Sequence, residues 1–211
     1  MTGAPLVIRW RWDGADDYPG VSCLNSEERQ RAAAFIDPKK GRRFAAFRAR
    51  LRELLGQELS VAPAAIALEP GRYGRPELAR PSALSFNLAH SGPEVVYAFS
   101  RSGDIGVDLE LHRDLSDLDA LMERTFSRRE AEEIRASASP RECFFRFWTA
   151  KEAVMKAAGM GFALSARRIR IAGGARITLE SVEGLEDESA AWRLQELPAE
   201  PGIDGHLCLT A

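Results

Sequence analysis

The chain has 211 residues, 45% hydrophobic and 28% charged, which is the composition of an ordinary globular protein with a substantial core. Its formal net charge of −2 excludes a general attraction to nucleic acid or to an anionic membrane. No segment has the pattern of a secretory leader or a membrane span, and Cys23, Cys143 and Cys208 lack any paired spacing. We therefore expect a cytoplasmic monomer with reduced thiols.

The first part of the chain is expected to form a strand and two helices. Apolar side chains alternate over residues 5–12, as in a strand with one buried face. Residues 26–35 begin at a helix-capping Asn25 or Ser26, and residues 41–59 carry an apolar stripe at helical spacing. Glycine, proline and arginine dominate residues 70–81, which we interpret as a loop.

The rest of the chain is expected to alternate between groups of strands and helices. Strands at 83–88, 94–100 and 104–111, joined by short turns, predict a compact antiparallel sheet or meander. Helices are predicted at 115–124, 127–137 and 142–158, the second with a capping box of Ser127 and Glu130. Short strands are predicted at 169–171, 176–179, 191–196 and 206–210.

The order strand, helices, strands occurs once in each half of the chain. This predicts an α+β fold with two similar α/β lobes in a pseudo-twofold arrangement, each an antiparallel sheet with packed helices. We place the N-terminal lobe at residues 1–104 and the C-terminal lobe at residues 105–211, with the active site at their interface.

Two carboxylates, Asp108 and Glu110, lie in the strand Ile105–Leu111. Residues two apart in a strand share a face, so both acids point the same way. Adjacent carboxylates repel each other unless a cation lies between them or solvent screens them. Taken alone, the pair is more typical of a solvated strand face than of a site.

A second group of polar residues lies in the helix at 142–158. Trp148, Glu152 and Lys156 are spaced i, i+4 and i+8 and share one face of that helix. Taken alone, this spacing is more typical of an ordinary surface Glu–Lys pair than of a site. However, lysine is rare in the chain, and Lys151 and Lys156 occur together beside an aromatic run.

The acids of the strand and the helix together suggest a metal site. Three carboxylates without cysteine or histidine among them suit magnesium, which prefers hard oxygen ligands and leaves positions for water and phosphate. Lys156 can then neutralise charge on a phosphate or on a leaving oxygen. His90, Ser91, Arg75 and Arg48 are further candidates for a ligand with several phosphates, although His90 alone is more typical of a structural histidine.

These segments resemble the Sfp-type 4′-phosphopantetheinyl transferases. The family's strand motif is matched by Gly106-Val107-Asp108-Leu109-Glu110, and its helix motif by residues 148–156, Trp-Thr-Ala-Lys-Glu-Ala-Val-Met-Lys. Two supporting elements appear in the family's order, as residues 73–76, Tyr-Gly-Arg-Pro, and residues 87–91, Asn-Leu-Ala-His-Ser. The resemblance covers roughly Ser26 to Gly161.

The resemblance implies transfer of the phosphopantetheine arm of coenzyme A to a serine of an apo acyl or peptidyl carrier protein, with release of adenosine 3′,5′-bisphosphate. It implies that Asp108, Glu110 and Glu152 hold Mg²⁺. Glu152 would help to deprotonate the carrier serine, and Lys156 would stabilise or protonate the leaving phosphate. The implied catalytic residues are Glu152, Lys156 and Asp108.

The resemblance also implies a coenzyme A site. Besides the catalytic residues, its members are Arg31, Arg48, Tyr73, Gly74, Arg75, Pro76, Asn87, Ala89, His90 and Ser91. Arg48 and His90 would hold the 3′-phosphate with help from Arg31, and Arg75 and Pro76 would border the adenine. Two positions depart from the family, because Arg75 replaces a lysine and Ala89 replaces a serine; we expect altered contacts there.

Two other functions fit parts of this pattern. A magnesium phosphohydrolase would use the same acids without a carrier protein, and a silent binding module would keep the fold without the reaction. For a transferase, we expect a basic surface that docks an acidic carrier, and Arg124, Arg128 and Arg129 are the candidates. A solvated helix face explains these three arginines equally well.

Overall fold

The computed structural model describes residues 4–14, 18–71, 74–198 and 200–210, and the structural statements below concern these residues. The first half of the chain contains β1 (Leu6–Arg11), α1 (Ser26–Ala33), α2 (Pro38–Leu59), β2 (Leu68–Pro70), β3 (Pro76–Leu78), β4 (Ser85–Ser91) and β5 (Glu94–Ser100). The second half contains β6 (Ile105–Leu111), α3 (Leu118–Thr125), α4 (Arg128–Ala136), α5 (Pro140–Ala157), β7 (Ile169–Ala172), β8 (Thr178–Val182), α6 (Glu186–Ser189), β9 (Arg193–Glu196) and β10 (Ile203–Leu209).

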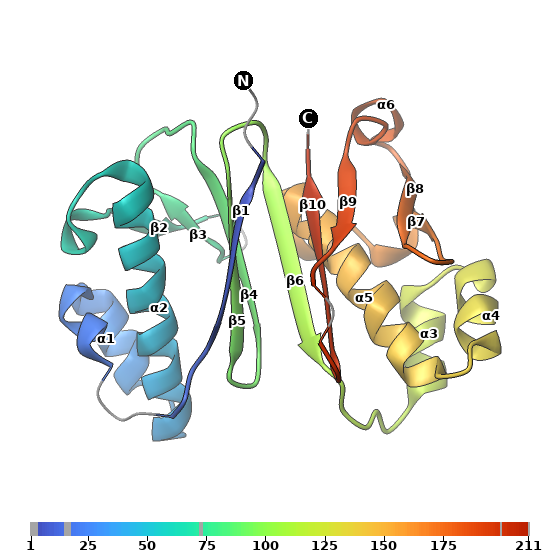
Figure 1. Ribbon diagram of the computed structural model, residues 1–211, viewed down its shortest axis with the longest axis horizontal. Coiled ribbons are helices and arrows are strands. Elements are labelled where there is room, and N and C mark those ends of the chain that lie inside the picture. Colours follow the sequence, from blue (N-terminus) through green and yellow to red (C-terminus); the bar gives the residue numbers. More distant parts are fainter. Residues whose placement is uncertain (1–3, 15–17, 72–73, 199, 211) are drawn as a thin grey trace. The chain divides into compact units, whose positions relative to one another are not determined.

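Each half contains an antiparallel sheet packed against helices, which confirms the predicted α+β fold class. One sheet has the strand order β1-β5-β4 and the other has the order β6-β10-β9 (Figure 1). Two-stranded sheets are formed by β2 with β3 and by β7 with β8. The strand β3 lies inside the segment that was expected to be a loop, because backbone pairing with β2 organises part of it.

The predicted meander of three consecutive strands is wrong at its third strand. β6 pairs with β10 from the far end of the chain, with Asp108 opposite His206. β4 nevertheless runs beside β6, and the Asn87 side-chain oxygen accepts a 3.2 Å hydrogen bond from the backbone N–H of Val107. β4 also extends to Ser91, three residues beyond its predicted end.

Packing divides the chain into two compact units. We call Arg9–Ser82 with Pro93–Val95 the helical unit, and Met1–Ile8, Ala83–Gly92 and Val96–Ala211 the larger unit. The predicted lobe boundary after residue 104 stays a prediction.

The helical unit is built on α1 and α2. Asn25 caps α1 by accepting from the Glu28 N–H at 2.8 Å, while the Glu28 carboxylate accepts from the Asn25 N–H at 3.1 Å. α2 begins three residues before its predicted start because the Asp37 side chain caps it, accepting from the Lys39 N–H at 2.9 Å. The two helices meet closely at Gly41, where a Cβ atom would lie only 2.3 Å from the Ala32 carbonyl oxygen.

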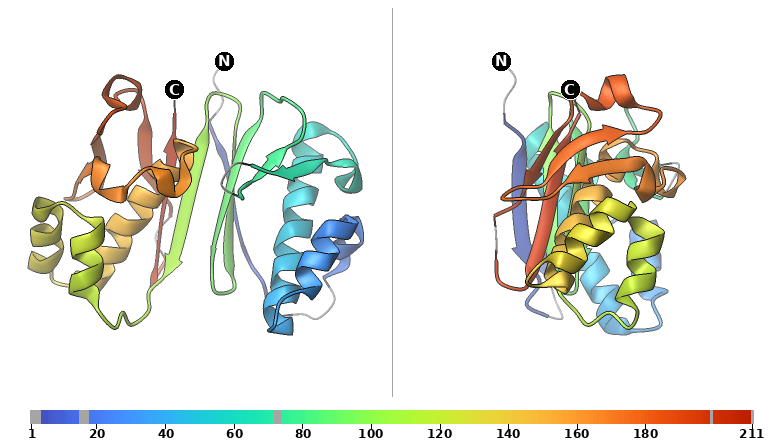
Figure 2. Two further views of the ribbon diagram at one scale, coloured as in Figure 1. Left: turned by 180° about the vertical axis from the view of Figure 1, so that it is seen from behind. Right: turned by 90° about the vertical axis from the view of Figure 1, so that its right-hand side faces the viewer.

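The larger unit is built around α5. This helix packs along both β6 and β10, with α3 and α4 on its outer side (Figure 2). The contact with β6 is close, because a Cβ atom on Gly106 would lie 2.1 Å from the Ala153 carbonyl oxygen. Phe144, Phe145 and Phe147 of α5 are buried in the core beneath it. The strand and the helix that carry the predicted acids are therefore in direct backbone contact.

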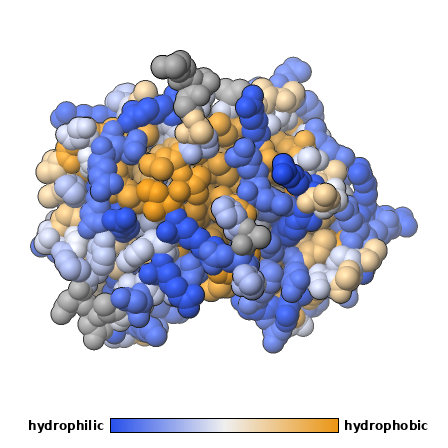
Figure 3. Space-filling model, viewed as in Figure 1, coloured by the Kyte–Doolittle hydropathy of each residue, from blue (hydrophilic) through white to orange (hydrophobic). Residues whose placement is uncertain are grey.

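The surface carries few large apolar side chains. On the face shown in Figure 3, apolar residues gather in one patch among hydrophilic ones. The exposed large hydrophobic residues are Leu6, Val21, Phe35, Ile36 and Val61. None of the helices in the described part of the chain combines the length and apolar character needed to cross a bilayer.

Candidate active site

Asp108 is the most deeply buried acid of the predicted site. It belongs to β6, is 7% exposed, and accepts a 2.6 Å hydrogen bond through Oδ1 from Lys156 Nζ of α5. The same ammonium donates to the Val107 carbonyl at 3.1 Å. Within the described residues, Asp108 Oδ2 is buried without a hydrogen-bond partner. A buried, unpaired carboxylate oxygen is costly, which favours a further donor or a cation at this position.

Glu152 is electrostatically coupled to the acids of β6. Burial raises the pKa of its carboxyl, Asp108 and Glu110 raise it further, and Lys156 lowers it. The pKa of Asp108 is likewise raised by burial and by Glu110, against the lowering effect of Lys156. The three acids and Lys156 therefore influence one another electrostatically.

Glu110 is oriented by two neighbours. The Ser91 hydroxyl donates to Glu110 Oε2 at 2.6 Å, and the Arg113 guanidinium donates to the same oxygen at 2.8 Å. Ser91 was predicted to contact the ligand phosphate, and here its hydroxyl instead holds a carboxylate. Glu110 is partly exposed, and these two hydrogen bonds hold its side chain on the same strand face as Asp108.

Chemically, three carboxylates and one ammonium form a site with excess negative charge. Such a group attracts a cation, and carboxylate oxygens suit Mg²⁺. Among the described residues, no three His, Cys, Asp or Glu side chains are gathered into a ready metal-binding cluster. The predicted ligand set Asp108, Glu110 and Glu152 thus stays a prediction.

Strand β4 separates the predicted residues of its motif onto two faces. Asn87, Ala89 and Ser91 are two residues apart and share one face, where Asn87 and Ser91 contact β6. Ala89 is buried, so the position where the family has a serine packs as an apolar contact. His90 lies between them in sequence, projects to the other face and is exposed.

In the helical unit, two predicted phosphate-binding arginines lie over one aromatic ring. The Arg31 and Arg48 guanidinium carbons are 5.1 Å and 5.7 Å from the centre of the Phe44 ring. Arg48 also lies 3.8 Å from Glu28, whose other oxygen accepts from buried Arg52 at 2.8 Å. A rigid ring that supports two guanidinium groups is suited to binding an anion of more than one charge.

The predicted adenine-binding loop is only partly described. Tyr73 lies outside the described residues. Gly74 adopts a φ of 77°, which favours glycine, and its N–H donates to the Gly71 carbonyl at 2.8 Å. Arg75 Nε lies 3.8 Å from Glu77, and Pro76 opens β3.

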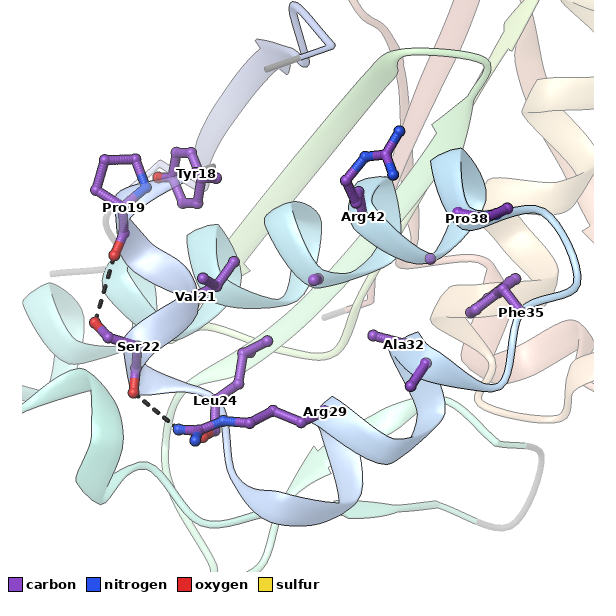
Figure 4. Close-up of a pocket in the computed structure, with 13 residues that line it drawn as sticks. Tyr18, Pro19, Val21, Ser22, Leu24, Arg29, Ala32, Phe35, Pro38 and Arg42 are labelled. Carbon is purple, nitrogen blue, oxygen red and sulfur yellow. Dashed lines mark hydrogen bonds between the residues drawn. The ribbon is translucent and has the colours of Figure 1, made fainter. Parts of the chain in front are cut away.

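A separate groove of about 750 Å³ lies between α1, α2 and the turn Pro19–Cys23 (Figure 4). Its walls are mostly apolar, and Arg29 at one end donates to the Ser22 carbonyl at 3.1 Å. No residue of the predicted site lines this groove. It carries none of the carboxylates needed for the predicted chemistry.

Two further buried polar residues were not identified from the sequence. Thr149 of α5 and His206 of β10 are joined by a 2.9 Å hydrogen bond, and both are buried. Thr149 lies inside the helix motif, so its position was a usable signal. His206 had none, because a single histidine near the end of the chain indicates no partner.

The comparisons with known proteins identify the family of this chain. Residues 104–211, which contain all three acids and Lys156, match the family described as the 4′-phosphopantetheinyl transferase superfamily. The chain is 39% identical over 183 residues to the 4′-phosphopantetheinyl transferase HetI of Nostoc sp., covering 84% of this chain and 74% of that protein.

Two further relatives come from eukaryotes. A phosphopantetheinyl transferase of Thraustochytrium sp. is 30% identical over 194 residues, covering 84% of this chain and 67% of that protein. The L-aminoadipate-semialdehyde dehydrogenase-phosphopantetheinyl transferase of Xenopus laevis is 27% identical over 217 residues, covering 90% and 72%.

The chain belongs to the 4′-phosphopantetheinyl transferase superfamily. It is accordingly a transferase that attaches phosphopantetheine to carrier proteins. The resemblance seen in the two sequence motifs is thereby confirmed.

Proposed function

We propose that this transferase takes the 4′-phosphopantetheine arm from coenzyme A, attaches it to a serine of an apo acyl or peptidyl carrier protein, and releases adenosine 3′,5′-bisphosphate in a Mg²⁺-dependent reaction. The observation that carries the proposal is the coupling of Asp108, Glu110 and Glu152 around Lys156. A serine that attacks a pyrophosphate needs positioning and charge neutralisation more than covalent catalysis.

The donor set fits Mg²⁺. Asp108 Oδ2 is buried without a hydrogen-bond partner among the described residues, and Glu110 and Glu152 add carboxylate oxygens. Mg²⁺ usually takes only one or two protein carboxylates and fills its other positions with water and substrate phosphate. When bound, the ion supplies neutralising charge to the pyrophosphate.

The protein's own residues then have separate roles. Glu152, whose carboxylate is coupled to Asp108 and Glu110, would remove the serine proton directly or through a water. Lys156, which donates to Asp108 at 2.6 Å, would stabilise or protonate the leaving phosphate. Asp108 thereby fixes the position of the ammonium.

The remaining residues support binding of coenzyme A. Arg31 and Arg48, which both lie over the Phe44 ring, are suited to the 3′-phosphate, and we assign His90 to the same group. Arg75 and Pro76 are assigned to the adenine. As part of this proposal, the two lobes of residues 1–104 and 105–211 meet at the active site.

The test is transfer itself. Purified protein, coenzyme A and Mg²⁺ are incubated with a panel of apo carriers, and intact-mass spectrometry measures the carrier. We expect a mass gain of one phosphopantetheine on the carrier serine and an equal amount of adenosine 3′,5′-bisphosphate by chromatography. Chelating the metal should stop both.

Matched variants separate the site from the fold. Asp108→Asn and Glu152→Gln keep side-chain size and should lower kcat/KM by about 10²-fold or more. Their urea midpoints should stay close to that of the wild type. Hydrolysis of coenzyme A without a modified carrier would favour a phosphohydrolase instead, and full turnover in both variants would refute the assigned acids.

A further inference from the structure

A row of polar side chains crosses the buried contact between α5 and its sheet. In the β6–β10–β9 sheet, His206 is paired with Asp108 on one side and with Glu196 on the other. Directly paired residues of an antiparallel sheet project from the same face. The three side chains therefore form one row on the face that α5 covers.

Each of these three strand residues contacts one polar side chain of α5. Arg146 Nε donates to Glu196 Oε1 at 2.7 Å. Thr149 contacts His206 at 2.9 Å, and Lys156 donates to Asp108 at 2.6 Å. Residues spaced by three and seven positions share one helix face, so these contacts hold a single face of α5 against three strands.

The central contact has a defined direction. The Thr149 hydroxyl donates its one proton toward the backbone, with the Phe145 carbonyl at 3.0 Å and the Arg146 carbonyl at 3.2 Å. Its oxygen is therefore the acceptor for His206, which donates from Nδ1–H. Thr149 is 0% exposed and His206 is 1% exposed, so water cannot replace either partner.

Glu152 lies between two of these contacts. It follows Thr149 by three residues and precedes Lys156 by four, so one contact fixes the helix before it and one fixes the helix after it. On the sheet side, the two anchoring residues His206 and Asp108 are direct neighbours across the ladder. The Thr149–His206 and Lys156–Asp108 contacts therefore constrain where the Glu152 carboxylate lies relative to Asp108.

We propose that His206 and Thr149 are positioning residues for the transfer reaction: their hydrogen bond sets the placement of α5 that brings Glu152 to Asp108, and so sets the affinity of the acid set for Mg²⁺. The proposal rests on the proposed function of those acids. Neither residue belongs to the predicted ligand set.

The test compares Thr149→Val with Thr149→Ser. Valine keeps the size of threonine and removes the hydroxyl, whereas serine keeps the hydroxyl and removes the methyl group. Mg²⁺ is titrated calorimetrically into each protein that has been mixed with coenzyme A. The Mg²⁺ dependence of carrier modification is measured separately. We expect Thr149→Val to weaken Mg²⁺ binding about tenfold, as loss of an orienting group does in metal sites. Thr149→Ser should stay within about twofold of the wild type on the same scale.

A second pair guards against a folding defect. His206→Leu removes the donor, and His206→Asn retains an N–H near the Nδ1 position. We expect His206→Leu to match Thr149→Val in Mg²⁺ affinity and His206→Asn to recover part of the loss. The double variant of Thr149→Val with His206→Leu should lose no more than either single variant, because both remove the same contact.

The outcomes separate positioning from simple stability. If Thr149→Val and His206→Leu lower the urea midpoint but bind Mg²⁺ and turn over coenzyme A like the wild type, the proposal is overturned. If Thr149→Ser weakens binding as much as Thr149→Val, the hydroxyl is not the cause and the proposal also falls. A wild-type protein that neither binds Mg²⁺ nor modifies a carrier would refute the proposed function first, and this inference with it.

Discussion

The ionised carboxylate of Glu196 in β9 is stabilised by several donors. Its Oε1 accepts from Arg146 Nε at 2.7 Å and from the Ile177 N–H at 3.3 Å, and lies 3.8 Å from His206 Nε2. The 3.8 Å separation is an ion-pair distance and too long for a hydrogen bond. His206 lowers the pKa of Glu196, burial opposes this, and Arg146 lowers it further, to about 2 from an ordinary 4.5.

This lowered pKa predicts a loss of stability in acid. Because the native state binds fewer protons than the unfolded chain between pH 4.5 and about 2, the stabilisation is complete above that window and is lost as the pH falls through it. With allowance for solvent screening of a partly exposed group, we expect Glu196→Gln to cost about 1–2 kcal/mol at pH 6. The difference from the wild type should shrink at pH near 3.

Urea unfolding at the two pH values measures this difference. Glu188→Gln makes the same change at an exposed carboxylate, serves as the control and should show no such change. An equal cost of Glu196→Gln at both pH values would contradict the assignment of this carboxylate as the acid-sensitive partner of Arg146.

At the same scale, the sequence predicts the acids but not what supports them. Asp108, Glu152 and Lys156 follow from strand and helix periodicity, because period alone decides which residues share a face. His206 and Glu196 do not, since their roles depend on which strand pairs with β6. Ser91 was assigned to a phosphate, yet its hydroxyl reaches Glu110, a contact that only the packing of β4 beside β6 reveals.

At the scale of elements, one carboxylate ties three of them together. Glu130 of α4 accepts from buried Lys151 of α5 at 2.7 Å, from the Ile171 N–H of β7 at 3.1 Å, and from the Ser127 N–H at the start of α4 at 2.7 Å. Lys151 is 0% exposed, and burial lowers its pKa to about 8 despite the Glu130 charge. Lys151, which precedes the proposed catalytic residue Glu152, is thus a buried structural residue.

Breaking the ion pair of Lys151 with Glu130 should destabilise the protein strongly. Lys151→Met leaves the Glu130 charge buried without its cation, which typically costs about 3–5 kcal/mol. Glu130→Gln alone leaves the ammonium unpaired. We expect the double variant to lose less stability than the sum of the two single variants, measured by urea unfolding. Strictly additive losses would mean that the pair does not interact as the structure shows.

The elements themselves were largely predictable, and their pairing was not. The capping box of Ser127 and Glu130 and the apolar stripe of α2 place helices by local chemistry. The pairing of β6 with β10 joins residues nearly a hundred positions apart, and no local pattern in either strand selects it. The meander was expected because short turns favour pairing of neighbouring strands, but β6 pairs with the distant strand β10.

At the scale of the whole molecule, the net charge of −2 leaves carrier recognition to local clusters. Arg124, Arg128 and Arg129 are exposed on α3 and α4. Arg128 pairs with Glu132 at 2.8 Å and Arg129 with Glu180 at 3.2 Å. Exposed pairs of this kind contribute only about 0–1 kcal/mol, so these arginines can exchange their partners for carboxylates of a docking protein at little cost.

If this surface docks an acidic carrier, reversing its charge should slow only the carrier reaction. We expect Arg124→Glu with Arg128→Glu to lower kcat/KM for the carrier about tenfold at low salt, with KM for coenzyme A unchanged. Salt at about 0.5 M should bring the variant and the wild type close together, because screening removes the attraction that the variant has already lost. An acid at the start of α4 is favourable to the helix dipole, so the fold should tolerate Arg128→Glu.

The matched control is Arg80→Glu with Arg193→Glu, which makes the same change in net charge at exposed arginines outside α3 and α4. A similar loss in the control would show that the carrier responds to total charge and not to this surface. A loss that persists at high salt would point to disturbed packing of α4 instead. Only a salt-sensitive loss specific to the carrier, confined to the α3–α4 variant, assigns these arginines to docking.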